Sequence, residues 1–160
     1  MTVTDETRGV AGVTTTVVHD VVRDATGAVI EDTFDWYAQD TRGNVWYFGE
    51  DTTAFEDGEQ STEGSWEAGV DGAQAGPVMA ATPRVGDGYQ QEFLPGEAED
   101  RAEVLSLDET RGEWTALVET LDTTPLEPGT EEHKFYAEGL GLVLEEGETE
   151  TVTLVGSDSD

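Results

Sequence analysis

Carboxylate side chains are the most abundant groups in this sequence that could do chemistry, because 37 of its 160 residues are Asp or Glu. Calcium takes about six to eight oxygen ligands and tolerates irregular loops that supply them. The carboxylates that gather near turns are therefore candidate metal ligands: Glu50, Asp51, Asp57, Glu59, Asp71 and Asp87. No stretch has the spaced Asp-x-Asp-x-Asp-Gly pattern of a regular calcium loop, so solvated carboxylates are the alternative. Ca²⁺ is the one cofactor that the sequence suggests.

The residues that commonly perform covalent or acid–base catalysis are sparse. The chain has no cysteine, which excludes a thiolate nucleophile and a thiolate metal site. The histidines His19 and His133 lie in strand-like surroundings outside any hydrolase motif. Glu67 and Asp71 flank a glycine-rich segment beside Trp66, and two carboxyl groups in a cleft can hydrolyse a glycosidic bond. We assign no catalytic residue, and enzymatic activity stays undecided, with a non-enzyme favoured.

Aromatic side chains form a second set of candidate functional residues. Neighbouring residues of a strand point to opposite faces of a sheet, so the runs around Trp36 and Trp46 place aromatic rings on both faces. One face can form the core. The other face either meets residues 68–88 or offers a platform to sugar rings, lipid or a partner protein. The candidate ligand-binding residues are Trp36, Tyr37, Trp46, Tyr47 and Trp66. Core packing is the alternative for all of them.

The formal net charge is −30, with 37 acidic residues against seven Lys and Arg. Such self-repulsion destabilises a compact state, and it weakens when salt shortens the Debye length from about 10 Å at 0.1 M to about 3 Å at 1 M. Strongly hydrated ammonium groups are also rare, since Lys134 is the single lysine. Both features favour a protein of molar brine, and an acidic secreted protein that stays soluble is the alternative. The charge disfavours nucleic acid and anionic membranes as partners, because both are bound through clustered Lys and Arg.

Short β-branched or aromatic runs that end at Gly, Asn or Asp predict antiparallel strands along most of the chain. A first hairpin joins residues 10–22 to 29–39 through a turn at 24–27. Residues 68–88 are rich in Gly, Ala and Pro, which predicts a long connection. The segment 97–107 also fits a short helix by its spacing of Ala and Leu. Further strands are expected at 45–48, 61–67, 89–94, 102–107, 113–121, 132–137, 140–145 and 149–155.

These strands predict an all-β fold. We expect a single antiparallel β domain over residues 1–155, built as a sandwich or as a strongly curved, partly open barrel-like sheet, with a frayed acidic tail at 156–160. The length allows a core that needs no disulfide. No apolar run approaches the roughly 18 residues of a membrane-spanning helix, and Met1 to Asp5 lack the basic start and apolar stretch of a secretory leader. We therefore expect no transmembrane segment.

Three strings of the sequence resemble those of a widespread family of uncharacterised secreted bacterial proteins. They are DWYAQD at 35–40, GNVWYFGED at 43–51 and GSWEAGVDG at 64–72, and further matches follow in order along most of the chain. The resemblance implies an exported, all-β protein and brings no known activity. Proteins of this family usually begin with a signal peptide and a further strand region, and often have a cysteine near the positions of Thr15 and Thr16. A missing first strand would leave an open sheet edge.

The sequence thus favours a non-catalytic binding or structural β module that is adapted to high salt and works in the cell envelope or outside the cell. An open strand edge could pair with a partner protein or with a second copy of the chain. One alternative is a carrier of a lipid or other apolar ligand in a half-open β-barrel. Another is a hydrolase that acts on polysaccharide. The secreted or envelope location follows from the resemblance, with the signal peptide absent from this chain, and the high-salt origin follows from the charge.

Overall fold

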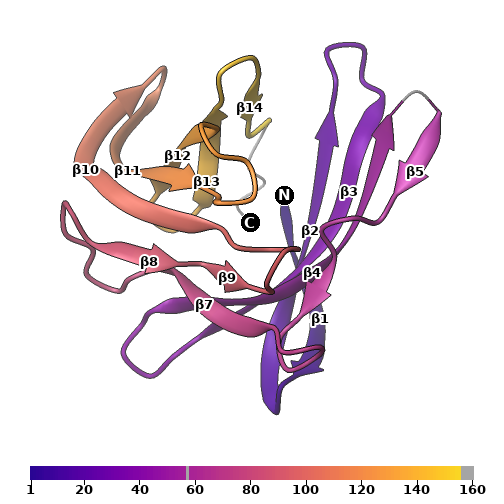
Figure 1. Ribbon diagram of the computed structural model, residues 1–160. Coiled ribbons are helices and arrows are strands. Elements are labelled where there is room, and N and C mark those ends of the chain that lie inside the picture. The colour runs from indigo at the N-terminus through magenta and orange to yellow at the C-terminus, as the bar shows by residue number, and fades with distance from the viewer. Residues whose placement is uncertain (57, 156–160) are drawn as a thin grey trace. The chain divides into compact units, whose positions relative to one another are not determined.

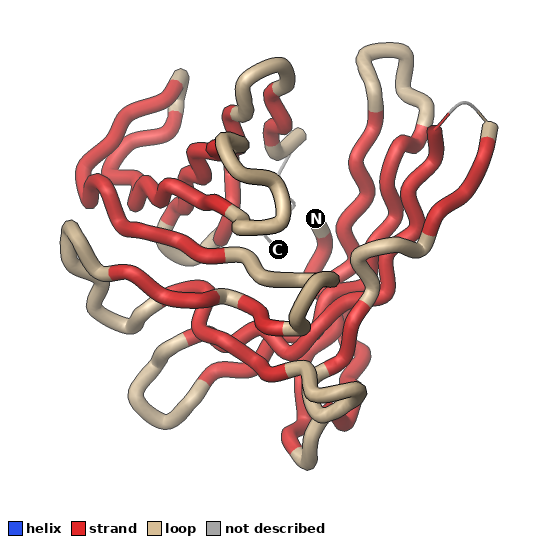
Figure 2. Tube along the Cα trace, viewed as in Figure 1, coloured by secondary structure: helices blue, strands red, loops and turns tan. Residues whose placement is uncertain are grey.

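Strands joined by turns and loops make up the part of the chain that the structure describes, residues 1–56 and 58–155. This computed structural model has 14 strands, and no helix occurs among those residues (Figures 1 and 2). The strand pairs are antiparallel, which confirms the predicted all-β, antiparallel fold. The chain divides into two units, Met1–Ala81 with Gln90–Glu99 and Thr82–Tyr89 with Asp100–Asp160.

The first unit contains a sheet of order β1-β2-β3-β4-β7-β9, with β5 and β6 paired to β4. Its strands are β1 (Thr2–Val10), β2 (Val13–Arg23), β3 (Val29–Gln39), β4 (Val45–Glu56), β5 (Glu59–Ser61), β6 (Trp66–Glu67), β7 (Gln74–Met79) and β9 (Glu92–Phe93). The β1–β2 hairpin closes through Ala11 and Gly12, at φ 47° and 80°. Two central residues at positive φ give a turn that matches the twist of the strands on either side.

The second unit contains a sheet of order β14-β13-β12-β11-β10-β8. Its strands are β8 (Gly88–Gln90), β10 (Arg101–Arg111), β11 (Trp114–Thr123), β12 (Glu131–Ala137), β13 (Gly141–Glu146) and β14 (Thr151–Thr153). From β10 onward each strand pairs with the next one along the chain. β8 spans the point at which the chain passes from the second unit to the first, between Tyr89 and Gln90.

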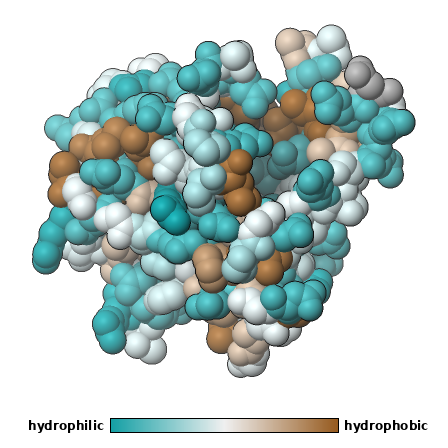
Figure 3. Space-filling model, in the orientation of Figure 1, coloured by the Kyte–Doolittle hydropathy of each residue, from teal (hydrophilic) through white to brown (hydrophobic). Residues whose placement is uncertain are grey.

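Each unit has its own hydrophobic core. The core of the first unit consists of Val10, Val17, Trp36, Tyr47, Trp66, Ala68, Ala73 and Ala98. The smaller core of the second unit consists of Leu117, Phe135 and Val143, and Phe135 is 0% exposed. On the face drawn in Figure 3 the surface is mostly hydrophilic, with separate apolar patches. A largely polar surface agrees with the excess of carboxylates in the sequence.

Two strands lie where the sequence does not predict them. β1 occupies residues that precede the first expected hairpin, and β7 lies within the 68–88 segment, so the prediction of a plain connection there is wrong. The strand character of β7 is hidden by Gly76 and Pro77. Gly76 is needed because a Cβ at this position would lie 2.1 Å from the carbonyl oxygen of Gln90.

The helical alternative for 97–107 is also wrong, because Arg101–Arg111 forms β10 and pairs with β11. Ala102 and Val104 are buried two residues apart on β10, and a period of two is that of a strand with one buried face. The prediction for the tail 156–160 falls outside the described residues. A single domain over 1–155 stays a prediction.

Candidate functional site

A group of polar and aromatic side chains gathers on one face of β3 and β4, in the first unit. The antiparallel register places Asp35 opposite Glu50 and Tyr37 opposite Tyr47, with an irregularity between the two pairs. Directly opposed residues share a face of the sheet. β6 adds Trp66 opposite Glu50, so these five side chains come from three strands that lie side by side.

Gly49 allows β6 to approach β4 this closely. Its φ is +127°, and a Cβ there would lie 2.2 Å from the carbonyl oxygen of Trp66. Glycine is the residue that adopts such a conformation without steric cost and that leaves room for a neighbouring backbone. The position of Trp66 beside Glu50 therefore depends on this glycine.

The aromatic members of the group pack against one another. The rings of Tyr37 and Tyr47 are stacked with centroids 4.9 Å apart, and Trp66 meets Tyr47 edge to face at 5.4 Å. Tyr47 is 9% exposed and Trp66 is 4% exposed. The structure thus brings together three of the five aromatic residues predicted as ligand-binding, and it places Tyr47 and Trp66 in the core.

Three carboxyl groups of the first unit are buried or half-buried in this region. The hydroxyl of Tyr47 donates a hydrogen bond of 2.7 Å to Oδ1 of Asp35, which is 6% exposed. Glu92, on β9, is 7% exposed. The pKa of Glu50 is raised to about 8, mainly by burial and in addition by the charges of Asp35 and Glu92, while a hydrogen bond from Tyr47 opposes the shift. We call Asp35, Glu50 and Glu92, with Tyr47, the carboxyl cluster.

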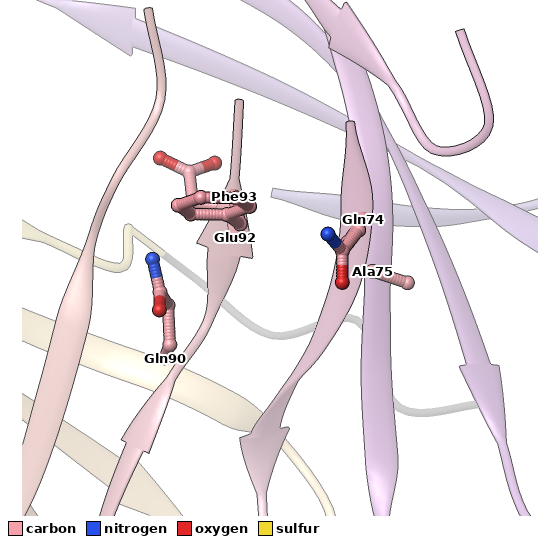
Figure 4. A pocket seen from close by; sticks show the side chains of 5 residues that line it. All are labelled: Gln74, Ala75, Gln90, Glu92 and Phe93. Carbon is pink, nitrogen blue, oxygen red and sulfur yellow. The ribbon is translucent and has the colours of Figure 1, made fainter. Parts of the chain in front are cut away.

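A pocket of about 260 Å³ adjoins the carboxyl cluster through Glu92. It is lined by Gln74, Ala75, Gln90, Glu92 and Phe93. Figure 4 shows the side chains of Gln74 and Ala75 on β7 and those of Glu92 and Phe93 on the neighbouring β9. The amide nitrogen of Gln90 is buried and has no hydrogen-bond partner. Amide groups, a carboxyl group and one aromatic ring form the wall of this pocket.

The remaining predicted aromatic residues lie apart from the carboxyl cluster. Trp36 is 4% exposed and lies under the guanidinium group of Arg8, which is 3.9 Å from its ring centroid. As a neighbour of Asp35 and Tyr37, it points to the other face of β3. Trp46 donates from Nε1 to Oδ2 of Asp40 at 3.2 Å. A hydrogen bond from the Asn44 amide is the main reason that the pKa of Asp40 falls to about 2.

The predicted metal ligands are dispersed over the chain. Glu50 belongs to the carboxyl cluster, whereas Asp51, Glu59 and Asp71 are exposed. Asp87 accepts a hydrogen bond from the backbone N–H of Arg84 through Oδ2. Asp57 lies outside the described residues. Within 1–56 and 58–155, no group of three or more His, Asp or Glu side chains is arranged to hold a metal ion. Calcium binding stays a prediction.

Asp35 and Glu92 are not among the site residues that the sequence predicts. Asp35 lies two residues from Tyr37 on a predicted strand, so alternation places both on one face, and that signal could have joined Asp35 to the aromatic set. Nothing in the local sequence joins Glu92 to Glu50. Their proximity arises because β9 pairs with β7, at Ala75↔Glu92, and β7 pairs with β4.

A second cluster of charges lies in the second unit, around Lys134. The ammonium group is 3.5 Å from Asp122, 3.5 Å from Glu132 and 3.7 Å from Glu145. The register explains this proximity, because Lys134 pairs with Glu145 of β13 and lies two residues from Glu132, which pairs with Asp122 of β11. Burial works against the charge of Lys134, but these carboxylates outweigh it and raise its pKa well above the ordinary value.

Comparison of the chain with protein-family models, curated proteins and solved structures gives no match. The resemblance to a secreted family therefore stays a prediction. None of the described residues forms a helix with the length and hydrophobicity needed to cross a bilayer.

Proposed function

We propose that the chain is a non-catalytic binding or structural β module adapted to high salt, working in the cell envelope or outside the cell. The observation that carries the proposal is the environment of Lys134. The single lysine of the chain has a side chain only 20% exposed and is surrounded by carboxylates. It therefore neutralises acids of its own unit and contributes little positive charge to the surface. The location part of the proposal rests on the resemblance to secreted proteins.

Two of the arginines support the same interpretation. Arg8 lies over Trp36 and is paired with Glu67. Arg111 lies 4.3 Å from the ring centroid of Phe135 and is paired with Glu109 at 2.8 Å. These guanidinium groups are engaged within the fold, and the carboxylates that outnumber them repel one another. Screening by dissolved salt is the simplest way to lower that repulsion.

Salt should stabilise the folded state of the chain. The melting temperature should rise smoothly from low to molar KCl, because the Debye length falls from about 10 Å at 0.1 M to about 3 Å at 1 M. Circular dichroism during heating measures the shift, and the same series with millimolar CaCl₂ separates screening from site binding. A melting temperature that does not change with KCl would contradict salt adaptation. A jump with calcium at low KCl would instead support the predicted calcium sites.

The binding part of the proposal is supported by the pocket beside β7 and β9. Amide groups such as those of Gln74 and Gln90 can hydrogen-bond hydroxyl groups, and an aromatic ring such as Phe93 can pack on the apolar face of a sugar ring. A few polar groups around an apolar wall are typical of small-ligand sites. We therefore propose a small polar ligand, such as one sugar ring of an envelope polymer.

Replacement of Phe93 by alanine should weaken the binding of a glycan fragment at this pocket. In molar KCl, soluble glycan fragments that raise the melting temperature of the wild-type chain should have at least about tenfold weaker affinity for Phe93→Ala, since loss of one aromatic stacking contact costs on the order of 1.4 kcal/mol. Isothermal titration calorimetry gives the affinities. Phe34→Ala is the control, because Phe34 is exposed on β3 and does not line the pocket. Equal affinities of both variants for every fragment would contradict binding at the pocket.

Self-association through an open edge concerns β1, which ends the sheet of the first unit. Its register shifts between Val3 and Thr7, and the exposed Asp5 and Glu6 lie in this irregular stretch. Bulges and charges on an edge strand oppose pairing with another chain. Sedimentation velocity in molar KCl, where charge repulsion is screened, distinguishes single chains from chains that have paired through β1.

A further inference from the structure

One face of the sheet in the first unit carries apolar and acidic side chains on β2, β3 and β4. The register places His19 of β2 and Asp51 of β4 on either side of Phe34, and directly opposed residues share a face of the sheet. Alternate residues of each strand lie on the same face. We call this surface the Phe34 face, and the residues that matter here are His19, Val21, Ile30, Asp32, Phe34 and Asp51.

The apolar part of the Phe34 face is open to solvent. Phe34 is 42% exposed, and Ile30, which precedes it on the same side of β3, is 36% exposed. Trp36, the next residue of β3 on this side, is only 4% exposed. The exposed apolar surface therefore begins where the core of the first unit ends. Large apolar side chains that are exposed together on one sheet face are typical of an interaction surface.

The ring of Phe34 is covered on one side and turned toward a carboxylate on the other. The imidazole of His19 stacks on it, with centroids 4.4 Å apart and an angle of 2° between the ring planes. Nε2 of His19 is 2.8 Å from Oδ1 of Asp32, a contact that orients the imidazole. Because the two rings are parallel, the other face of Phe34 points away from β2 and toward β4. The exposed Asp51 lies directly opposite on that strand.

The same combination of an aromatic ring and a carboxylate holds an arginine at two other places in the chain. Arg8 lies over Trp36 at 3.9 Å from the ring centroid, and Arg111 lies over Phe135 at 4.3 Å. Each of these arginines is also paired with a glutamate. In the part of the chain that the structure describes, no guanidinium group lies over Phe34 in this way. The Phe34 face therefore presents a third ring and carboxylate to an arginine from elsewhere.

We propose that the Phe34 face binds an arginine side chain of a partner protein, with the guanidinium group between the ring of Phe34 and the carboxylate of Asp51. A guanidinium group is weakly hydrated, stacks on aromatic rings and forms two parallel hydrogen bonds to a carboxylate. Val21 and Ile30 offer apolar surface to the residues on either side of that arginine. Molar salt shortens the Debye length to about 3 Å, so it screens distant charges and leaves these direct contacts. The Phe34 face shares no residue with the pocket beside β7 and β9, and the inference does not depend on glycan binding.

Binding of an acetylated and amidated peptide, Leu-Arg-Leu, to the full chain in molar KCl tests the proposal. NMR titration should show saturable shifts of the ring protons of Phe34 and of the backbone amides of residues 30–34. A peptide with citrulline in place of arginine keeps the shape of the side chain without its charge, and it should bind at least about threefold more weakly. Phe34→Leu and Asp51→Asn should each weaken binding of the arginine peptide by a similar factor. Asp71→Asn is the control, because Asp71 is exposed and lies outside β2, β3 and β4, and it should bind as the wild type does.

The proposal is overturned if the citrulline peptide binds as tightly as the arginine peptide, a comparison that needs no variant and so does not depend on a variant folding. Equal binding of the arginine peptide by the wild type and Phe34→Leu would also overturn it, as would equal losses for Asp51→Asn and Asp71→Asn. Shifts of the Phe34 ring protons that grow with protein concentration, without any peptide, would place a second copy of the chain on this face instead. None of these readouts involves a glycan, so a failure here is distinct from a failure of the pocket to bind one.

Discussion

Replacement of Lys134 by methionine should lower the free energy of unfolding by about 3–5 kcal/mol, because it leaves the buried carboxylate of Asp122 without its compensating charge. Methionine keeps much of the length and apolar surface of the lysine side chain and removes the ammonium group. Asp122, which is 4% exposed and 3.5 Å from the ammonium, should be affected most. The loss should be measured by urea unfolding in molar KCl, so that general charge repulsion is already screened.

The matched control for this variant is Arg101→Met. Arg101 is exposed on β10 of the same unit, and exposed charges typically contribute about 0–1 kcal/mol. If Lys134→Met and Arg101→Met lost similar amounts of stability, Lys134 would have no special structural role. The central observation behind the proposed salt adaptation would then lose its energetic meaning.

The second large effect is expected for Gly49→Ala, which should destabilise the protein by about 3 kcal/mol through backbone strain and steric overlap. Gly49 has φ +127°, and the added Cβ would lie 2.2 Å from the carbonyl oxygen of Trp66. β6 must therefore move away from β4, which withdraws Trp66 from Tyr47. Urea unfolding measures the stability, and the fluorescence of the tryptophans should report the altered environment of Trp66.

Gly72→Ala separates the two causes. Gly72 also has a positive φ, +91°, but no atom lies within 4 Å of the position of its added Cβ. This variant should lose only the strain contribution, on the order of 1 kcal/mol. If Gly49→Ala were no more harmful than Gly72→Ala, the close approach of β6 to β4 would not contribute to stability.

Local sequence was sufficient to predict strands whose ends are fixed by turn residues. The strand expected at 29–39 has these bounds in the structure, where it is β3. Asp24 explains the turn before it, because its Oδ1 accepts hydrogen bonds from the backbone N–H groups of Thr26 and Ala28. Such side-chain to backbone bonds are local and can be recognised from residue type alone.

β1 and β7 could not be predicted because their signals are weak or lie elsewhere in the chain. β1 has almost no buried face, with Val10 as its one buried residue, so it lacks the alternation of apolar and polar residues that predicts a strand. Its turn uses Ala11 at positive φ, a conformation uncommon outside Gly, Asn and Asp. β7 contains Gly76 for a contact made by Gln90, which the local sequence cannot reveal.

The candidate site was predicted in fragments. Tyr37, Tyr47 and Trp66 were expected to be ligand-binding and Glu50 to be a metal ligand, and the structure places all four on one face of the sheet. Their combination depends on the register shift between the Asp35 and Tyr37 pairs, which brings Tyr47 and Asp35 into hydrogen-bonding distance. A shift in register is set by pairing between strands, so no single segment encodes it.

The division of the chain also has a consequence for biosynthesis. The first unit is completed by Gln90–Glu99, which follows Thr82–Tyr89 of the second unit. On the ribosome, Leu94 and Ala98 must therefore emerge before the core of the first unit can close. A nascent chain that ends at Ala81 would leave the edge of β7 open, and open edges favour aggregation. Between synthesis of β7 and synthesis of β9, the high net negative charge of the chain opposes association at this edge.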